Sequence, residues 1–289
     1  MSAVPLPRRI VVAIDSPAHA RAAMEAATDL ALRLRAEITA VFVEDIDLFR
    51  LAALPFAREI GSDAQTRPFD MPRLERRFRS EAREVRAVCM EAAERSRTQV
   101  RVEVARGAIA QEILAVAEEA DMIMLGRARA TARGRVAPRE GDRSRRRSTP
   151  LGSTAMSVLA TSTRTVAIVT PDRVIGRPVA VVYDGSEASR RALDLGVRLA
   201  GEDHHNLVVL LSGDEDRGDR LSAEVTAITR PHGIVPRCVA VTGAAGSIAE
   251  AVTAKDCRAL VIDRNWERPE AGDLLALVER LDCPVFVVG

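Results

Sequence analysis

Hydrophobic runs of strand length alternate with amphipathic helical segments along the whole chain. The first run, Ile10 to Ile14, ends at Asp15, and apolar residues then recur with helical spacing at Ala20, Met24, Ala27, Ala31 and Leu34. Ser16 followed by Pro17 is typical of a helix start, because proline is tolerated in the first turn. Strands that alternate with helices predict a parallel sheet with right-handed crossovers.

The same order of elements occurs twice. A second copy begins with a strand-like run from Val179 to Tyr183, followed by Asp184-Gly185-Ser186 and another amphipathic helix. Later strands also correspond: Ile38 to Val43 with Leu207 to Leu211, and Val166 to Val169 with Val285 to Val288. The sequence therefore predicts an α/β protein with two tandem, doubly wound, five-stranded parallel-type sheets of the Rossmann-like kind. We place the first domain at residues 1–172 and the second at 173–289, with a linker near Pro171 to Arg177.

The composition of the chain argues against several classes of protein. The hydrophobic share is 47% and the aromatic share only 3%, so the cores must be built from Val, Ile, Leu and Ala. A formal net charge of +1 gives no overall field that favours nucleic acid or membranes. The chain lacks an apolar run long enough for a transmembrane helix, its start lacks a signal region, and its four cysteines lack CxxC spacing. These features predict a cytoplasmic protein with reduced thiols.

The first half carries an arginine-rich insertion, at about residues 127–150, that has no counterpart in the second. Residues 127–147 contain nine arginines against Glu140 and Asp142, a local charge of +7. Its Arg, Ser, Gly and Pro content predicts a mobile surface loop. Three roles stay open: a solvated insertion, a lid over a nucleotide, or an electrostatic contact with an acidic partner or nucleic acid. The loop lacks interleaved aromatics, which argues against base stacking.

Four segments of the first half are expected to meet at the carboxyl ends of the strands, where open parallel sheets bind ligands. Asp15 ends the first strand, Val43 the second and Gly126 the fourth, while Gly152-Ser153-Thr154 opens the next helix. Glycine lets the backbone approach a phosphate closely, and a helix N-terminus offers N–H groups and a positive dipole to an anion. Ser153 and Thr154 add hydroxyl donors. These residues predict a phosphate cradle, although an ordinary strand end and helix start would use the same residue types.

At these residues the chain resembles the universal stress protein family, in particular its tandem-domain members. The likeness rests on the openings IVVAID and VAVVYDGS, the ADMIMLG strand, the LGST helix start and the VAIV closing strand, and it covers nearly the whole chain. Nucleotide-binding members share a signature of Gly, two residues, Gly, nine residues, then Gly and Ser or Thr. The resemblance implies that Gly126, Gly152 and Ser153 hold phosphates, and that Asp15 and Val43 lie near the adenosine. It also implies an internal pseudo-dimer in which the closing strands, Thr165 to Thr170 and Pro284 to Val288, meet.

The signature is only half intact. Arg129 stands at its second glycine position, and 25 residues separate Gly126 from Gly152 where the signature has twelve. An arginine there could bind phosphate through its charge and fork geometry, or it could fill the space that phosphates need. In the second half the fourth strand ends in Asp263, a carboxylate that would repel phosphates. Asp184-Gly185-Ser186 is best interpreted as a strand-to-helix turn with a helix cap, and Trp266 as a packing or interface residue.

Two functions from different classes follow. The first is a universal stress-type protein that binds ATP or a related adenine nucleotide, with or without magnesium, in its first half and acts in stress response or signalling. The second is a nucleotide-free module for protein contacts, with a degenerate site. The histidines, His19, His204, His205 and His232, form no triad with a nucleophile, so we expect no enzyme beyond slow, incidental ATP hydrolysis. An adenylate-forming enzyme of the same ancestral fold is a remoter alternative. A homodimer of whole chains is left open.

Overall fold

The computed structural model describes residues 7–60, 65–127, 151–170, 175–201, 206–213, 215–266 and 272–289. The elements of the first half are β1 (Arg9–Ile14), α1 (Pro17–Leu34), β2 (Glu37–Asp45), α2 (Ile46–Ala52), β3 (Arg58–Ile60), β4 (Thr66–Pro68), α3 (Met71–Ser96), β5 (Val100–Gly107), α4 (Ile109–Val116), β6 (Met122–Gly126), α5 (Ser153–Thr161) and β7 (Thr165–Val169). Those of the second half are β8 (Val179–Tyr183), α6 (Glu187–Ala200), β9 (Leu207–Ser212), α7 (Glu215–Thr229), β10 (Arg237–Val241), α8 (Ala245–Ala254), β11 (Ala259–Asp263), α9 (Gly272–Arg280) and β12 (Val285–Val288). Short 3-10 helices follow α4 and α7, at Ala117–Glu119 and Arg230–His232.

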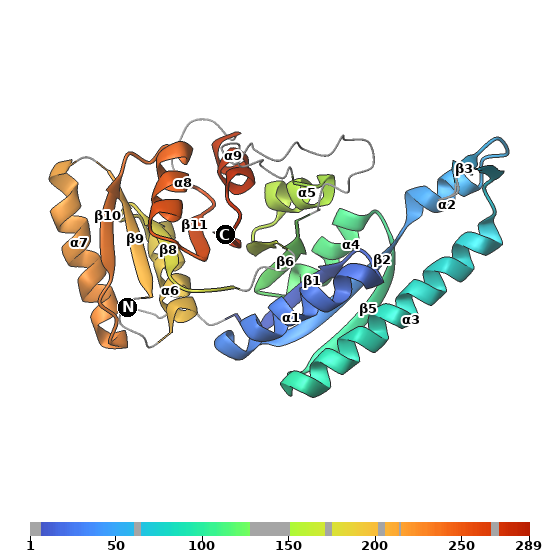
Figure 1. Cartoon of the computed structure of the whole chain (residues 1–289), viewed down its shortest axis with the longest axis horizontal. Helices are drawn as coiled ribbons and strands as arrows, with labels where there is room; N and C mark the ends of the chain where they lie inside the picture. Colours follow the sequence, from blue (N-terminus) through green and yellow to red (C-terminus); the bar gives the residue numbers. More distant parts are fainter. Residues whose placement is uncertain are drawn as a thin grey trace, which may run out of the picture.

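One continuous ten-stranded sheet crosses the molecule, in the order β10-β9-β8-β11-β12-β7-β6-β1-β2-β5 (Figure 1). Each half contributes five strands, and the order within a half is the same when counted from its own first strand. The pairs within a half are parallel, whereas β7 and β12 pair antiparallel, with Val166 opposite Val287 and Ala167 opposite Phe286. The predicted α/β class is thus confirmed, and the closing strands meet as the resemblance implied.

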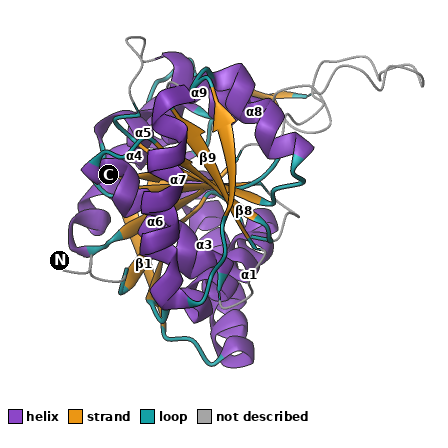
Figure 2. Cartoon of the chain, turned by 90° about the vertical axis from the view of Figure 1, so that its left-hand side faces the viewer, coloured by secondary structure: helices purple, strands orange, loops and turns teal. Residues whose placement is uncertain are grey.

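Helices cover both faces of this sheet (Figure 2), and the core on each face contains residues of both halves. One core lies under α1, α3, α6 and α7, and includes Ile10, Val12 and Ile14 of β1. The other lies under α4, α5, α8 and α9, and includes Val11 of the same strand. Successive side chains of a strand point to opposite faces, so a buried strand must be apolar at nearly every position. This is why the strands could be recognised as continuous hydrophobic runs.

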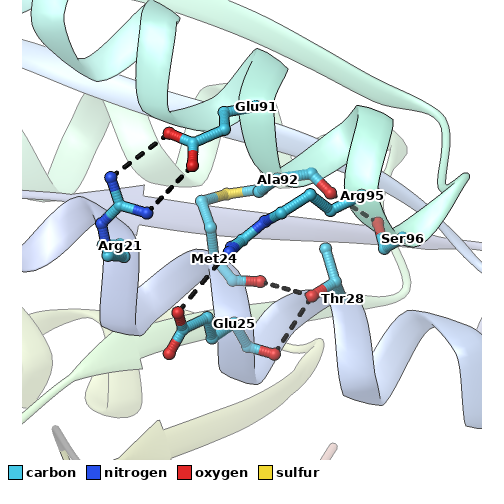
Figure 3. Close-up of polar contacts among 8 residues, drawn as sticks. All are labelled: Arg21, Met24, Glu25, Thr28, Glu91, Ala92, Arg95 and Ser96. Atoms are coloured by element: carbon cyan, nitrogen blue, oxygen red, sulfur yellow. Dashed lines mark hydrogen bonds and ion pairs between the residues drawn. The ribbon is translucent and has the colours of Figure 1, made fainter.

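Ion pairs as well as apolar packing join α1 to α3 (Figure 3). The Arg21 guanidinium donates to both carboxylate oxygens of Glu91, at 3.1 and 3.2 Å, and Arg95 lies 3.8 Å from Glu25. Met24 is fully buried on the same side of α1. These pairs are half exposed, so packing contributes more than charge to this contact.

The longer stretch of the first half, from Glu44 to about Arg79, contains α2, the two short strands β3 and β4, and the start of α3. Figure 1 shows α2 and β3 projecting from the body of the molecule. Phe49 of α2 stacks on Phe78 of α3 with ring centroids 5.3 Å apart, and the Arg106 guanidinium lies 4.1 Å from the centroid of Phe49. These aromatic contacts attach the base of the projection to the body.

Two sequence-based boundaries differ from the structure or fall outside it. The second strand was expected to end at Val43, but β2 continues to Asp45 because it pairs with β5 as far as Gly107, where Glu44 and Arg106 form an ion pair. The proposed domain boundary and most of the linker lie outside the described residues. Within the described ranges, every helix is too short or too polar to serve as a membrane span.

Candidate functional site

A cavity of about 420 Å³ lies at the carboxyl ends of the first-half strands. Asp15 comes directly after β1, and Gly126 is the last residue of β6. Five of the residues predicted to bind nucleotide line this cavity: Asp15, Val43, Gly126, Gly152 and Thr154. The structure thus brings together four segments that are far apart in the sequence, as the strand-end argument predicted.

Both glycines of the half-intact signature line the cavity. Gly126 is exposed, and a Cβ atom added to it would meet no other atom within 4 Å. Gly152 is the N-cap of α5, where no side chain caps the helix, and its carbonyl accepts from the Met156 N–H. The N–H groups of the first turn of a helix lack intrahelical acceptors and carry the positive end of the helix dipole. This end of the cavity therefore offers donors to an anion.

The remaining predicted residues are placed differently. Thr154 is half-buried and lines the cavity, whereas Ser153 is exposed and is not among the lining residues. Arg129 and the rest of residues 128–150 lie outside the described part of the chain. The lining also includes Arg127, which directly follows Gly126 and which the sequence analysis did not single out.

A polar cluster stands where α1 begins. The His19 Nδ1 atom lies 3.0 and 3.2 Å from the two carboxylate oxygens of Asp15, and 3.1 Å from the Ser16 hydroxyl. The Ser16 hydroxyl in turn donates to Asp15 at 3.2 Å. Both His19 and Asp15 line the cavity. The spacing of four residues is compatible with this contact, but Asp15 lies outside α1, and the spacing alone does not mark His19 as a cavity residue.

Charge is distributed unevenly around the cavity. The carboxylates of Asp15, Glu25 and Asp29 all lie on the α1 side. The nearby Arg95 partly offsets the charge of Glu25 (Figure 3). On the opposite side Arg127 is buried, and burial holds the pKa of its guanidinium below the usual value even though the neighbouring Asp282, Cys283 and Glu279 act to raise it. An anionic group is therefore favoured near Gly126 and α5, and disfavoured near α1.

The second half has no equivalent glycine pair. Asp263, the last residue of β11, is 5% exposed, and its Oδ1 atom has no hydrogen-bond partner among the described residues. Burial raises the pKa of its carboxyl, against the effect of neighbouring Arg191. Trp266 is buried in the core of the second half, which confirms its predicted packing role. A buried carboxylate at this strand end would repel a phosphate group.

The turn after β8 has the structural role predicted for it. An oxygen of the Asp184 carboxylate accepts from the Ser186 N–H at 2.9 Å, and the Ser186 hydroxyl accepts from the Ser189 N–H at 3.0 Å, capping α6. Gly185 has φ +85°, a backbone conformation that side chains disfavour. Burial acts to raise the pKa of Asp184, but hydrogen bonds from Ser186 and Ser189 outweigh it and hold that pKa below the usual value.

Solved structures with this fold match nearly the full length of the chain. A universal stress protein from Archaeoglobus fulgidus DSM 4304 is 16% identical, with a TM-score of 0.71 and 97% of each chain covered. A functionally unknown protein from Pseudomonas aeruginosa PAO1 is 15% identical, with a TM-score of 0.60 and coverage of 98% of this chain and 92% of the other. A putative universal stress protein from Pseudomonas aeruginosa UCBPP-PA14 is 14% identical, with a TM-score of 0.59 and coverage of 98% and 93%. These identities establish similarity of fold alone.

Sequence comparison adds the family. No curated protein matches the chain. The model of the universal stress protein family matches residues 7–170, which is more than half of the chain and includes every segment that lines the cavity. The chain therefore belongs to the universal stress protein family.

Proposed function

We propose that the first half binds ATP or a related adenine nucleotide and that the protein acts in stress response or signalling in the cytoplasm. One observation carries the proposal: the cavity at the strand ends opens between Gly126 and the N-terminus of α5, with Asp15 and Val43 also in its lining. Its volume of about 420 Å³ is within the usual range of small-molecule sites. We further infer that the second half is a diverged copy of the same family unit, because its strands follow the same order.

Charge suggests how the nucleotide lies. Phosphates belong beside Gly126 and the first turn of α5, where backbone N–H groups and the helix dipole favour negative charge. The ribose and adenine belong toward Asp15 and Val43, because a carboxylate accepts hydrogen bonds from hydroxyl or amino groups but repels phosphate. Magnesium accompanying the phosphates would weaken the remaining repulsion from the α1 carboxylates.

We do not propose a catalytic role. His19, the titratable imidazole of the cavity, is engaged by Asp15 and Ser16. Hydrolysis of ATP requires a group that orients the attacking water close to the terminal phosphate. Among the described residues, the phosphate end of the cavity offers backbone donors, Thr154 and Arg127 rather than a base. Any hydrolysis is therefore expected to be slow and incidental.

Isothermal titration of the purified chain with ATP tests this proposal, with and without magnesium and at low and moderate salt. We expect saturable binding at about one site per chain, weaker heat with GTP, and thermal stabilisation that grows with ATP concentration. The absence of both heat and thermal stabilisation at about 5 mM ATP would reject nucleotide binding, since ligand linkage predicts a measurable shift for any affinity in that range.

A nucleotide-free interaction module is the second candidate, and the projection at residues 51–60 favours it. Four large apolar side chains within ten residues are exposed: Leu51 at 43%, Leu54 at 42%, Phe56 at 76% and Ile60 at 76%. Exposed apolar residues that cluster in this way are typical of protein contacts. The same titration separates the candidates, because this function predicts neither heat nor stabilisation with any nucleotide.

A further inference from the structure

Both ends of the segment that separates the two cradle glycines are held by one helix of the second half. Arg127, directly after Gly126, donates from its guanidinium to the carbonyl of Val278 in α9. Leu151, directly before Gly152, donates its N–H to the Glu279 carboxylate at 3.1 Å. Two adjacent residues of α9 therefore contact the neighbours of both glycines.

Helix chemistry explains the first of these contacts. The last carbonyls of a helix lack intrahelical donors and carry the negative end of the helix dipole, so a cation is favoured there. Val278 lies in the last turn of α9 and receives Arg127 in this way. The Arg127 N–H also donates to the Val169 carbonyl at 2.7 Å, which fixes the backbone just after Gly126.

The second half repeats the arginine contact but not the carboxylate contact. Arg264 follows Asp263 as Arg127 follows Gly126, and it donates to the carbonyl of Leu159 in α5. Leu159 and Val278 are each the seventh residue of a nine-residue helix. The eighth residue is Glu279 in α9 but Ala160 in α5, and alanine has no acceptor. Among the described residues, this contact of a helix carboxylate with the residue before the N-cap, which we call the brace, therefore occurs at the half that keeps the glycine pair.

We propose that Glu279 is a positioning residue for the nucleotide site, so that the second half braces the cradle of the first. The Glu279 carboxylate holds the Leu151 N–H, and thereby fixes Gly152 and the first turn of α5 opposite Gly126. The proposal rests on nucleotide binding by the first half. Under this proposal the second half supports the site of the first half without binding a ligand itself.

The test compares E279A, E279Q and R264Q with the unchanged chain, using two readouts. ATP titration measures affinity, and amide hydrogen exchange measures protection of the Leu151 to Met156 segment. We expect E279A to bind ATP about tenfold more weakly and to exchange faster in this segment, because one hydrogen bond to a charged acceptor is lost. E279Q keeps an amide oxygen as acceptor and should recover most of the affinity. R264Q removes an inter-half bond near the other end of α5 from Gly152 and should leave affinity unchanged.

Each outcome decides the proposal. Unchanged ATP affinity in E279A would overturn it, as would an equal loss in R264Q, which would show only a loosened interface. If the unchanged chain binds no ATP, the proposed function has failed and hydrogen exchange decides alone. Faster exchange in E279A but not in E279Q would then retain the brace, and unaltered exchange would reject it.

Discussion

The fourth strands of the two halves end in opposite chemistry. β6 ends at Gly126, exposed beside an open cavity, whereas β11 ends at Asp263, a buried carboxylate. The residue that follows is an arginine in both halves, and both arginines reach across to a helix carbonyl of the other half. The contact between the halves has therefore kept its symmetry, while the residues at the site have diverged.

This difference shows that the fold and the site depend on different residues. Strand order and the antiparallel pairing of β7 with β12 depend on apolar runs, which both halves retain. A phosphate site depends on one residue without a side chain at one strand end. Replacing that residue by aspartate leaves the topology intact but reverses the local charge preference.

The largest effect is expected when the first half is given the residue of the second. G126D should weaken ATP binding more than 100-fold, because two charges about 4 Å apart repel by about 4 kcal/mol near a protein surface. The space beside Gly126 is open, so the fold should tolerate the side chain. Titration with ATP measures the effect, and circular dichroism checks the fold.

G126N is the matched control, because asparagine has the size of aspartate without its charge. It should retain more affinity than G126D. Equal loss in the two variants would mean that volume rather than charge excludes the phosphates. Unchanged binding in G126D would place the nucleotide elsewhere.

A second experiment tests whether the two arginines are equivalent. R127M and R264M keep an apolar stem but leave the carbonyls of Val278 and Leu159 without these donors. Each should lower the free energy of unfolding by about 1–2 kcal/mol. This is the cost of a lost charged hydrogen bond, less the gain from removing a buried Nε that has no partner among the described residues. Urea denaturation measures both variants. A difference above about 1 kcal/mol between them would contradict the symmetry.

The architecture could be predicted because buried parallel strands are continuous hydrophobic runs, which helices of regular spacing separate. The convergence of Asp15, Val43, Gly126 and Gly152 followed from their places at or near the ends of strands and at the start of a helix. The cavity residues on α1 were missed because helical spacing identifies a face without saying that a cavity borders it. His19 is the clearest case.

The contacts of α9 with Arg127 and Leu151 could not be predicted from the sequence. Arg127 lies 151 residues from Val278, and Leu151 lies 128 residues from Glu279. Their contacts depend on how β7 and β12 pair, because that pairing sets α9 beside the ends of the first-half segment. A local sequence pattern cannot reveal these partners, because the pairing of β7 with β12 determines which residues of the two halves meet. The internal symmetry of Arg127 and Arg264 became visible only once Leu159 and Val278 could be aligned as helix positions.

The smallest expected effect concerns the pH dependence of stability in the second half. The pKa of Asp263 is raised by burial, so the folded state holds this proton more tightly than the unfolded state does. Its contribution to stability is present below the usual aspartate pKa and is lost as pH rises through the raised pKa. D263N should therefore stabilise the chain by about 1 kcal/mol at pH 7, by removing a buried charge, and give no gain in acid.

Asp184, in the turn after β8, provides the opposite case, because its pKa is held below the usual value. Its contribution to stability is present above the usual pKa and is lost as pH falls through the lowered one, so D184N should destabilise the chain at pH 7 and have little effect in acid. Urea unfolding of both variants from about pH 3 to pH 8 gives the two curves. If D263N destabilised the chain at pH 7, the Asp263 carboxylate would be a favourable partner of Arg191, and the second half would have exchanged its phosphate site for an ion pair. If instead the two variants shift stability in opposite directions, burial of the Asp263 carboxylate costs more free energy than its neighbours return, whereas the first half has open space at the matching position. That contrast is the physical difference between the half that holds the site and the half that braces it.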